Sequence, residues 1–237
     1  MIEFKNVKIG YDSPLAQIYF DTLHSGSIYA LIGSNGSGKS TFLKTICGKE
    51  KALEGSIFID NKNIQEFSML ELAKQIAFVP ARFPEIDFMT VFDFIALGRT
   101  PYINNFGRLN QNDNSIIKTI IDKLHITHLE NKFTYQLSDG EKQLCSIARA
   151  LTQQTPILLL DEPTSFLDYR NKRRLLHTLY TLSQEMNLVI LFSTHDLESI
   201  QQFDIQKIGI EANSKDRKIE MVSKSLDLDS IVNKYYH

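Results

Sequence analysis

The sequence that decides the fold reads Gly33-Ser34-Asn35-Gly36-Ser37-Gly38-Lys39-Ser40-Thr41. It fits G-x-x-x-x-G-K-[ST], a pattern in which glycines let the backbone wrap around an anion and turn its N–H groups toward phosphate oxygens. The apolar run Ile28–Ile32 before it is typical of a strand, and the spacing after it is typical of a helix whose N-terminus faces the anion. The alternative is a Gly- and Ser-rich turn before a lysine, which the flanking strand and helix disfavour. We expect Lys39 to reach the β- and γ-phosphates of a nucleotide and Ser40 to bind Mg²⁺.

Two acidic residues follow a second apolar strand. The run Ile157–Leu160 leads directly into Asp161 and Glu162. Open α/β sheets bind ligands at the carboxyl ends of their strands. We therefore expect Asp161 to hold Mg²⁺, directly or through water, and Glu162 to polarise an attacking water. A buried strand ending in acids is common by itself, so this interpretation depends on the phosphate loop.

A third apolar run, Leu188–Phe192, ends in Ser193-Thr194-His195-Asp196. His195 could simply cap the next helix together with its neighbours. The strand direction favours a different place, at the same sheet edge as Lys39 and Asp161 and close to the γ-phosphate.

Apolar periodicity predicts the remaining elements. Strands are expected at Ile2–Ile9, Gln17–Phe20, Ser27–Ile32, Gly55–Ile59 and Lys207–Ile210, helices at Val91–Leu97, Ile116–Leu124, Glu141–Leu151, Asn171–Met186 and from about Asp196, and an exposed loop at Pro101–Asn114. Alternating short strands and helices indicate a mostly parallel sheet covered on both faces. The fold class is α/β, a P-loop (RecA-like) sheet with an antiparallel β subdomain and an inserted helical subdomain.

We predict a single domain over residues 1–237. Residues 1–83 and 152–237 form its nucleotide-binding core with the β subdomain, and residues 84–151 form the inserted helical subdomain. The tail, residues 211–237, is expected to form a polar hairpin and a last helix around Leu228–Tyr235, and its sequence indicates no function.

Composition narrows the classes of partner. The chain has 237 residues, of which 43% are hydrophobic and 23% charged, and its net charge is −2. This balance gives no general electrostatic reason to expect nucleic acid. The N-terminal sequence has no basic region followed by an apolar stretch, so it does not resemble a signal peptide. No apolar run approaches the ~20 residues that span a bilayer as a helix, so any membrane role is expected through a partner. Cys47 and Cys145 have no CxxC spacing and are expected to be reduced thiols of a cytoplasmic protein.

The segment Leu137-Ser138-Asp139-Gly140-Glu141-Lys142-Gln143 opens a predicted helix. Alone, Ser138 and Glu141 form a capping box, which only starts a helix. The order of the motifs changes this interpretation. The phosphate loop, this Leu-Ser-x-Gly segment, the Asp-Glu-Pro sequence, Ser165–Asp168 and a strand-end histidine together resemble the ABC transporter ATPases across nearly the whole chain.

The resemblance implies an ATPase that binds MgATP between two head-to-tail copies, with Ser138 and Gly140 of one chain closing on the phosphate loop of the other. It further implies that Tyr11 stacks on adenine, unless Tyr11 is an ordinary strand aromatic. It makes Asp168 a link between the two sites, Glu162 the general base and His195 the switch histidine. Asp139 and Glu141 depart from the family's Leu-Ser-Gly-Gly-Gln signature and bring carboxylates near an anion site.

A more serious departure follows the predicted strand at Ile76–Val79. The family has a glutamine there that touches Mg²⁺ and the attacking water and senses the permease. This chain has Ala81 and then Arg82. An alanine side chain can neither contact Mg²⁺ and the attacking water nor sense the permease. Hydrolysis could therefore be slow, or coupled to the permease through other contacts.

The segment from Thr90 to Asp113 resembles importers of iron–siderophore, haem or cobalamin. That resemblance implies a membrane permease contacting residues 82–108, an indirect role for a cargo-binding protein, and a peripheral place on the cytoplasmic face of the membrane. Two other interpretations stay open. One is a soluble ABC-type ATPase that acts on a protein complex, and the other is a weakly catalytic, nucleotide-dependent regulator.

Overall fold

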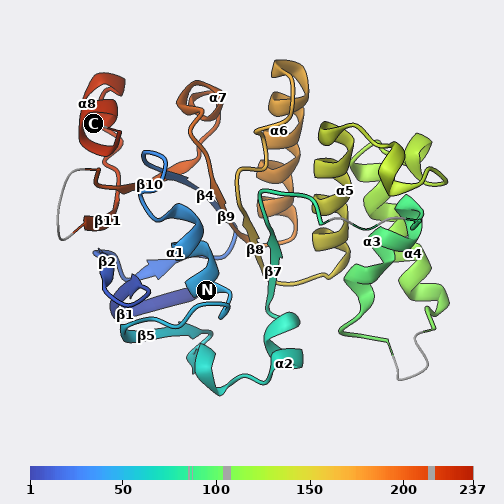
Figure 1. The fold of residues 1–237 in the computed structure, drawn as a ribbon, viewed down its shortest axis with the longest axis horizontal. Coiled ribbons are helices and arrows are strands. Elements are labelled where there is room, and N and C mark those ends of the chain that lie inside the picture. The colour runs from blue at the N-terminus through green and yellow to red at the C-terminus, as the bar shows by residue number, and fades with distance from the viewer. Residues whose placement is uncertain (85, 87, 104–107, 213–216, 237) are drawn as a thin grey trace.

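The computed structural model describes residues 1–84, 86, 88–103, 108–212 and 217–236. Within these residues the strands join into one sheet of order β6-β5-β1-β2-β11-β10-β4-β9-β8-β7, with β3 paired to β1 (Figure 1). Of the helices that these residues form, none is both long and apolar enough to cross a bilayer.

One half of this sheet is parallel. It contains β4 (Ser27–Ile32), β7 (Ile76–Val79), β8 (Ile157–Leu160), β9 (Val189–Ser193) and β10 (Gln206–Ile210). Every residue of β8 and β9 is buried, as continuous apolar runs in a sheet covered on both faces should be. The carboxyl ends of these strands therefore meet at one edge.

The other half is mostly antiparallel. It contains β1 (Ile2–Gly10), β2 (Pro14–Ile18), β3 (Thr22–Leu23), β5 (Glu54–Ile59) and β6 (Lys62–Asn63). The halves are joined by β11 (Arg217–Met221), which pairs antiparallel with β10 and parallel with β2. The antiparallel part is thus an extension of the central sheet.

The helices follow from capping and apolar spacing. They are α1 (Lys39–Ile46), α2 (Met69–Ala73), α3 (Val91–Ala96), α4 (Gln111–Lys123), α5 (Asp139–Thr152), α6 (Tyr169–Glu185), α7 (Leu197–Gln201) and α8 (Leu228–Tyr235). Single 3₁₀ turns lie at Ile64–Glu66, Leu97–Arg99, Thr127–Leu129 and Thr134–Gln136. Helices α3, α4 and α5 gather beyond β7, at the end of the molecule opposite β1, β2 and β5 (Figure 1).

Two hydrophobic cores lie on the two faces of the sheet, and alternate residues of one strand contribute to each. Ile28, Ala30 and Ile32 of β4 enter the core shared with α3–α6 and α8, whereas Tyr29 and Leu31 enter the core shared with α1 and the antiparallel strands. This two-residue period is the geometry of a strand covered on both sides.

The predicted fold class is confirmed, while several predicted boundaries are wrong. The strand predicted at Gln17–Phe20 is β2 at Pro14–Ile18, and Gln111–Asn114 of the predicted loop belong to α4. The two-residue strands β3 and β6 were not predicted, because pairs this short carry no periodicity. The last helix predicted for the tail is present as α8, whereas only the second strand of the hairpin, β11, lies in the tail and pairs with β10, which precedes it. Within residues 84–151 the described residues form helices and one isolated bridge between Thr90 and Phe133.

Candidate functional site

The Gly-rich loop connects β4 to α1, and two of its glycines are required by the backbone. Gly33 has φ 153° and Gly38 has φ 114°, values that residues with a side chain rarely adopt. A Cβ at Gly33 would lie 2.8 Å from the Ser37 hydroxyl, and one at Gly38 would lie 2.7 Å from Leu15. The chain can close this tightly only without side chains at these positions.

Lys39 is folded back onto the loop. Its Nζ donates to the carbonyl oxygens of Gly33, at 2.7 Å, and Ser34, at 3.0 Å. Burial lowers the pKa of the Lys39 ammonium, while the Glu162 and Asp161 carboxylates act in the opposite direction. The lysine, both acids and the loop are therefore electrostatic neighbours.

The acidic pair is organised by a hydroxyl from the neighbouring strand. Ser193, the last residue of β9, donates to Asp161 Oδ1 at 2.6 Å and accepts from the Glu162 N–H at 2.8 Å. Glu162 has φ 51°, a left-handed backbone conformation that is uncommon for a residue with a side chain. Its Oε2 is 2.8 Å from His195 Nδ1, so the strand-end acid and the strand-end histidine form a hydrogen-bonded pair.

A cleft of about 640 Å³ collects most of the predicted residues. Its lining includes Asn35, Gly36, Gly38, Lys39, Ser40, Thr41, Asp161 and Glu162, together with the segment Tyr11–Leu15. The Tyr11 ring is 54% exposed at the rim, and its hydroxyl accepts from Thr41 Oγ1 at 3.4 Å. Gly33, Ser34 and His195 line an adjoining cavity that shares Asn35 and Glu162 with the cleft.

Magnesium fits the chemistry of this cleft. Ser40 and Asp161 both line it, and hard oxygen donors are the ligands that Mg²⁺ prefers. Among the described residues there is no group of three or more His, Cys, Asp and Glu side chains that could hold a metal ion. A Mg²⁺ ion here would need nucleotide phosphates and water as its other ligands, which is the usual arrangement for this ion.

Four predicted residues line neither the cleft nor the adjoining cavity: Ser37, within the phosphate loop, and Ser138, Gly140 and Asp168, far from it in the sequence. Strands β9, β8 and β7 stand between α1 and α5 (Figure 1). Ser138 and Glu141 form the capping box of α5, and Asp168 caps α6 by accepting from the Asn171 N–H at 2.8 Å. Gly140 packs against Leu167 and Phe166.

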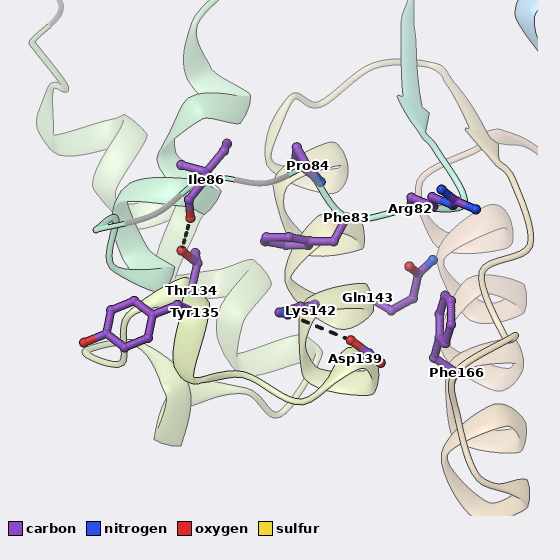
Figure 2. Close-up of a pocket in the computed structure, with 10 residues that line it drawn as sticks. All are labelled: Arg82, Phe83, Pro84, Ile86, Thr134, Tyr135, Asp139, Lys142, Gln143 and Phe166. Atoms are coloured by element: carbon purple, nitrogen blue, oxygen red, sulfur yellow. Dashed lines mark hydrogen bonds and ion pairs between the residues drawn. The ribbon is translucent and has the colours of Figure 1, made fainter.

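A third cavity, of about 410 Å³, separates the start of α5 from the segment after β7. Figure 2 shows Phe83, Pro84 and Ile86 on one side of it and Asp139, Lys142 and Gln143 of α5 on another. We call this cavity the α5 groove; it is lined by Arg82, Phe83, Pro84, Ile86, Thr134, Tyr135, Asp139, Lys142, Gln143 and Phe166. The Gln143 amide nitrogen is buried and has no hydrogen-bond partner among the described residues. The predicted contact region 82–108 includes residues 85, 87 and 104–107, which lie outside the described residues.

Sequence reasoning missed two residues of the site. In the sequence, Ser193 appears only as part of the end of a predicted strand. A hydroxyl at the end of a strand that neighbours the one carrying the two acids could have indicated a hydrogen bond to them. Arg217 of β11 donates to the carbonyl oxygens of Gly36 and Ser37, both at 3.4 Å, and no local pattern connects it with a loop so distant in the sequence.

The parallel sheet, the glycine-wrapped lysine and the acidic strand end in one cleft define a P-loop nucleoside triphosphatase. Comparison with known families sharpens this class. Residues 17–165 match the model of the ABC transporter family, and the chain belongs to that family as an ATP-binding, ATP-hydrolysing subunit.

Similar proteins of known assignment include importer subunits. The chain is 34% identical over 204 residues to the iron(3+)-hydroxamate import ATP-binding protein FhuC of Bacillus subtilis, which covers 86% of this chain and 76% of FhuC. It is 36% identical over 179 residues to the molybdate import ATP-binding protein MolC of Haemophilus influenzae, covering 76% of this chain and 65% of MolC. An inward-facing structure of a metal-chelate type ABC transporter superposes with a TM-score of 0.82 at 28% identity, over 99% of this chain and 88% of that one.

Proposed function

We propose that this chain powers uptake of an iron complex, a siderophore or haem, or of cobalamin, through a separate membrane permease. Family membership establishes the ATP-binding subunit, and the proposal adds the cargo. The hydroxamate importer relative and the metal-chelate transporter structure support it. The single observation that carries the ATPase part of the proposal is the cleft in which Lys39, Asp161 and Glu162 meet, because phosphate-binding and water-activating groups face the same space there.

In this proposal each side chain of the cleft has one task. Lys39 leaves the Gly33 and Ser34 carbonyls and binds the β- and γ-phosphates, while the N–H groups from Gly36 to Thr41 surround them. Tyr11, exposed at the rim, stacks on adenine. Glu162 accepts a proton from the attacking water, and His195 contacts the γ-phosphate.

Ser40 and Asp161 hold the magnesium ion that the cleft is suited to accept. When bound, the ion neutralises charge on the phosphate oxygens during transfer. The Ser193 hydroxyl fixes the Asp161 carboxylate for this task through its 2.6 Å hydrogen bond.

The site requires a second copy of the chain. Ser138 and Gly140 stand at the start of α5, outside their own cleft, where free helix N–H groups can receive the γ-phosphate of a partner. Two chains then pair head to tail around two ATP molecules. Asp168, beside this segment, links one site to the other.

The α5 groove is the proposed permease contact (Figure 2). Its wall is apolar on the Phe83 side, and a stacked aromatic pair extends it, with the Phe133 and Tyr135 ring centroids 5.6 Å apart and 14° between their planes. A helix of the permease can bury apolar side chains here and offer an acceptor to the orphaned Gln143 amide. The chain would then sit peripherally on the cytoplasmic face of the membrane, and a cargo-binding protein would act through the permease alone.

A regulator with weak catalysis is the second candidate, because of one observation. Ala81 lines the cavity beside Glu162 and offers no polar side chain to nucleotide, metal or water. An ATPase acting on a soluble protein complex would use the same cleft.

The experiment is reconstitution with a candidate permease that co-purifies with this chain from detergent-solubilised membranes. In proteoliposomes we expect uptake of a ferric hydroxamate or haem that depends on ATP, together with permease-stimulated phosphate release. Tyr135→Glu should abolish the stimulation and keep basal turnover, since Tyr135 is 55% exposed in the α5 groove. Tyr19→Glu, at a site that is 53% exposed and away from that groove, is the matched control. ATP-driven uptake of molybdate alone would contradict the proposed cargo, and no stimulation by any permease would favour the regulator.

A further inference from the structure

A second cavity adjoins the nucleotide cleft. It has a volume of about 520 Å³, and its lining includes Ala81, Arg82, Glu162, His195 and Tyr236. Asn35 and Glu162 belong to both cavities. The space where a γ-phosphate and an attacking water would lie therefore continues to the last described residue of the chain.

The Tyr236 hydroxyl in this wall is an orphan. Its oxygen is completely buried and has no hydrogen-bond partner among the described residues. The Gly33 amide and the Glu162 and Asp196 carboxylates are close enough to influence it, although none has the geometry of a hydrogen bond. Burial raises the pKa of the Tyr236 phenol, so the group keeps its proton at neutral pH and can donate it to an acceptor.

Helix α8 holds this hydroxyl in place. The Tyr235 carbonyl accepts from the Ser34 N–H of the phosphate loop at 3.0 Å, and the Tyr235 hydroxyl donates to Glu220 at 2.8 Å. The Tyr235 ring lies so close to Gly209 that a Cβ there would be 2.2 Å from it. A buried hydroxyl without a partner is destabilising. Its place in a well-anchored segment indicates that it gains a partner in another state of the protein.

At residue 81 the same cavity has no side chain that could donate a hydrogen bond. Ala81 presents only a methyl group to the cavity. The hydrogen bond of Glu162 to His195 uses Oε2, and a carboxylate can accept several hydrogen bonds. The bond to His195 leaves Oε1 of the Glu162 carboxylate able to accept from a second donor.

We propose that Tyr236 is a positioning residue for ATP hydrolysis, whose hydroxyl donates to the Glu162 carboxylate, directly or through one water, in the nucleotide-bound state. This inference rests on the proposed function, in which Glu162 is the general base. The hydroxyl holds the carboxylate toward the attacking water, the task for which residue 81 has no side chain. The C-terminal helix is thereby part of the site.

Tyr236→Phe in the full chain tests this, because it removes the oxygen and keeps the ring. We expect kcat for phosphate release with MgATP to fall roughly ten- to a hundred-fold, the effect of one hydrogen bond to a charged group in the transition state. The KM for ATP should not change, and the melting temperature should stay equal or rise, because an unsatisfied hydroxyl has been removed.

Tyr29→Phe is the matched control. It deletes a buried hydroxyl that accepts from the His24 N–H at 2.9 Å and lines neither cavity, so it should lower the melting temperature and leave kcat of the folded protein unchanged. Ala81→Gln added to Tyr236→Phe should restore turnover, because an amide at residue 81 faces the same cavity.

Wild-type kcat in Tyr236→Phe overturns the proposal. A loss of turnover that Ala81→Gln does not relieve also overturns it, since the hydroxyl would then act elsewhere. Glu162→Gln, assayed in parallel, separates the two hypotheses: normal turnover in that variant removes the base role itself, whatever Tyr236→Phe does.

Discussion

In the free chain the Ser138 hydroxyl is occupied by a carboxylate from its own helix. Ser138 Oγ donates to Glu141 Oε2 at 2.9 Å, and the same oxygen accepts from the Ser138 N–H at 2.8 Å. The hydrogen bond from the Ser138 amide is the main reason that the pKa of Glu141 lies below its usual value, so Glu141 is charged at neutral pH. In the proposed dimer, a phosphate bound by the partner chain would have to displace this carboxylate to reach Ser138.

Glu141→Gln should therefore favour ATP-driven closure. The amide oxygen can still accept from the Ser138 N–H, so the capping box survives while the negative charge is lost. We expect the ATP concentration for half-maximal phosphate release to fall roughly three- to ten-fold, because repulsion of an anion in a partly exposed site is removed. The stability change should stay within about 0.5 kcal/mol, because the ion pair with Lys132 is largely exposed.

Glu141→Ala is the control that removes the cap as well. It should cost about 1 kcal/mol of stability in urea unfolding, as loss of a helix cap usually does. An unchanged or higher half-maximal ATP concentration in Glu141→Gln would show that the carboxylate does not compete with phosphate.

At the residue scale, sequence reasoning found side chains at motif positions and missed those that arrive by tertiary packing. Lys39, Asp161 and Glu162 were predictable because chemistry and strand direction confine them to one sheet edge. Ser193 bridges two acids across neighbouring strands, and Tyr236 reaches the cavity only because β11 and α8 fold back onto the sheet. No local pattern encodes that return.

Among the elements, a buried ion pair connects three helices. The Arg99 side chain, 5% exposed, donates through Nε to Asp113 Oδ1 at 2.9 Å, and Asp113 is 3% exposed. Asp113 also accepts from the Asn110 N–H at 3.0 Å, closing the capping box of α4. Arg99 donates further to the Thr152 carbonyl at the end of α5, at 2.9 Å. The ends of α3 and α5 and the start of α4 are thus fixed to one another.

Asp113→Asn should destabilise the protein by roughly 3 kcal/mol at pH 7, because it leaves a buried guanidinium without its anion. Burial alone would raise the pKa of Asp113, but hydrogen bonds from Asn110 and Arg99 outweigh it and hold the pKa below its usual value. The stabilisation is therefore present above the unfolded pKa of about 3.9 and is lost as the pH falls from there through the lower folded pKa.

Urea unfolding at pH 7 and pH 3 measures both effects, with the difference between wild type and Asp113→Asn shrinking at pH 3. Glu185→Gln, which breaks an exposed pair with Lys123, should change stability by less than about 0.5 kcal/mol and serves as control. Equal stability of wild type and Asp113→Asn at pH 7 would contradict the structural role of the pair.

The Arg99–Asp113 pair lies in the segment whose sequence resembles importers of iron complexes. Both side chains are buried and take part in packing, so at these two positions the resemblance reflects the fold of the helical region.

Elements defined by continuous apolar runs, such as β8, were predicted with the observed bounds. Helix α4 was predicted to start five residues late, because the polar cap at Asn110–Asp113 resembles a loop until the ion pair behind it is known.

On the scale of the whole molecule, the proposed head-to-tail dimer would build each site from two halves that lie far apart in one chain. The sheet continues from β6 to β7, with the phosphate loop after β4 and α5 packed beyond β7. In the cleft, Lys39 donates to the carbonyls of its own loop, and His195 Nδ1 pairs with the Glu162 carboxylate. Binding of nucleotide in the proposed dimer would exchange the Lys39 bonds for bonds to phosphate.

Glu162→Gln should separate binding from hydrolysis and trap the closed pair. The amide is nearly the same size, can still pair with His195 and cannot accept a proton from water, so turnover should fall roughly a hundred-fold or more. Without loss of the γ-phosphate the closed dimer persists. Light scattering after gel filtration should show the mass double in MgATP and return to that of one chain in EDTA. Ser138→Arg in the same background is the matched control: Ser138 lies outside its own cleft, so each chain should still bind ATP yet remain single. A dimer that forms despite Ser138→Arg would mean that the two chains meet through another surface, and a monomeric Glu162→Gln that retains ATP would mean that nucleotide alone does not close them.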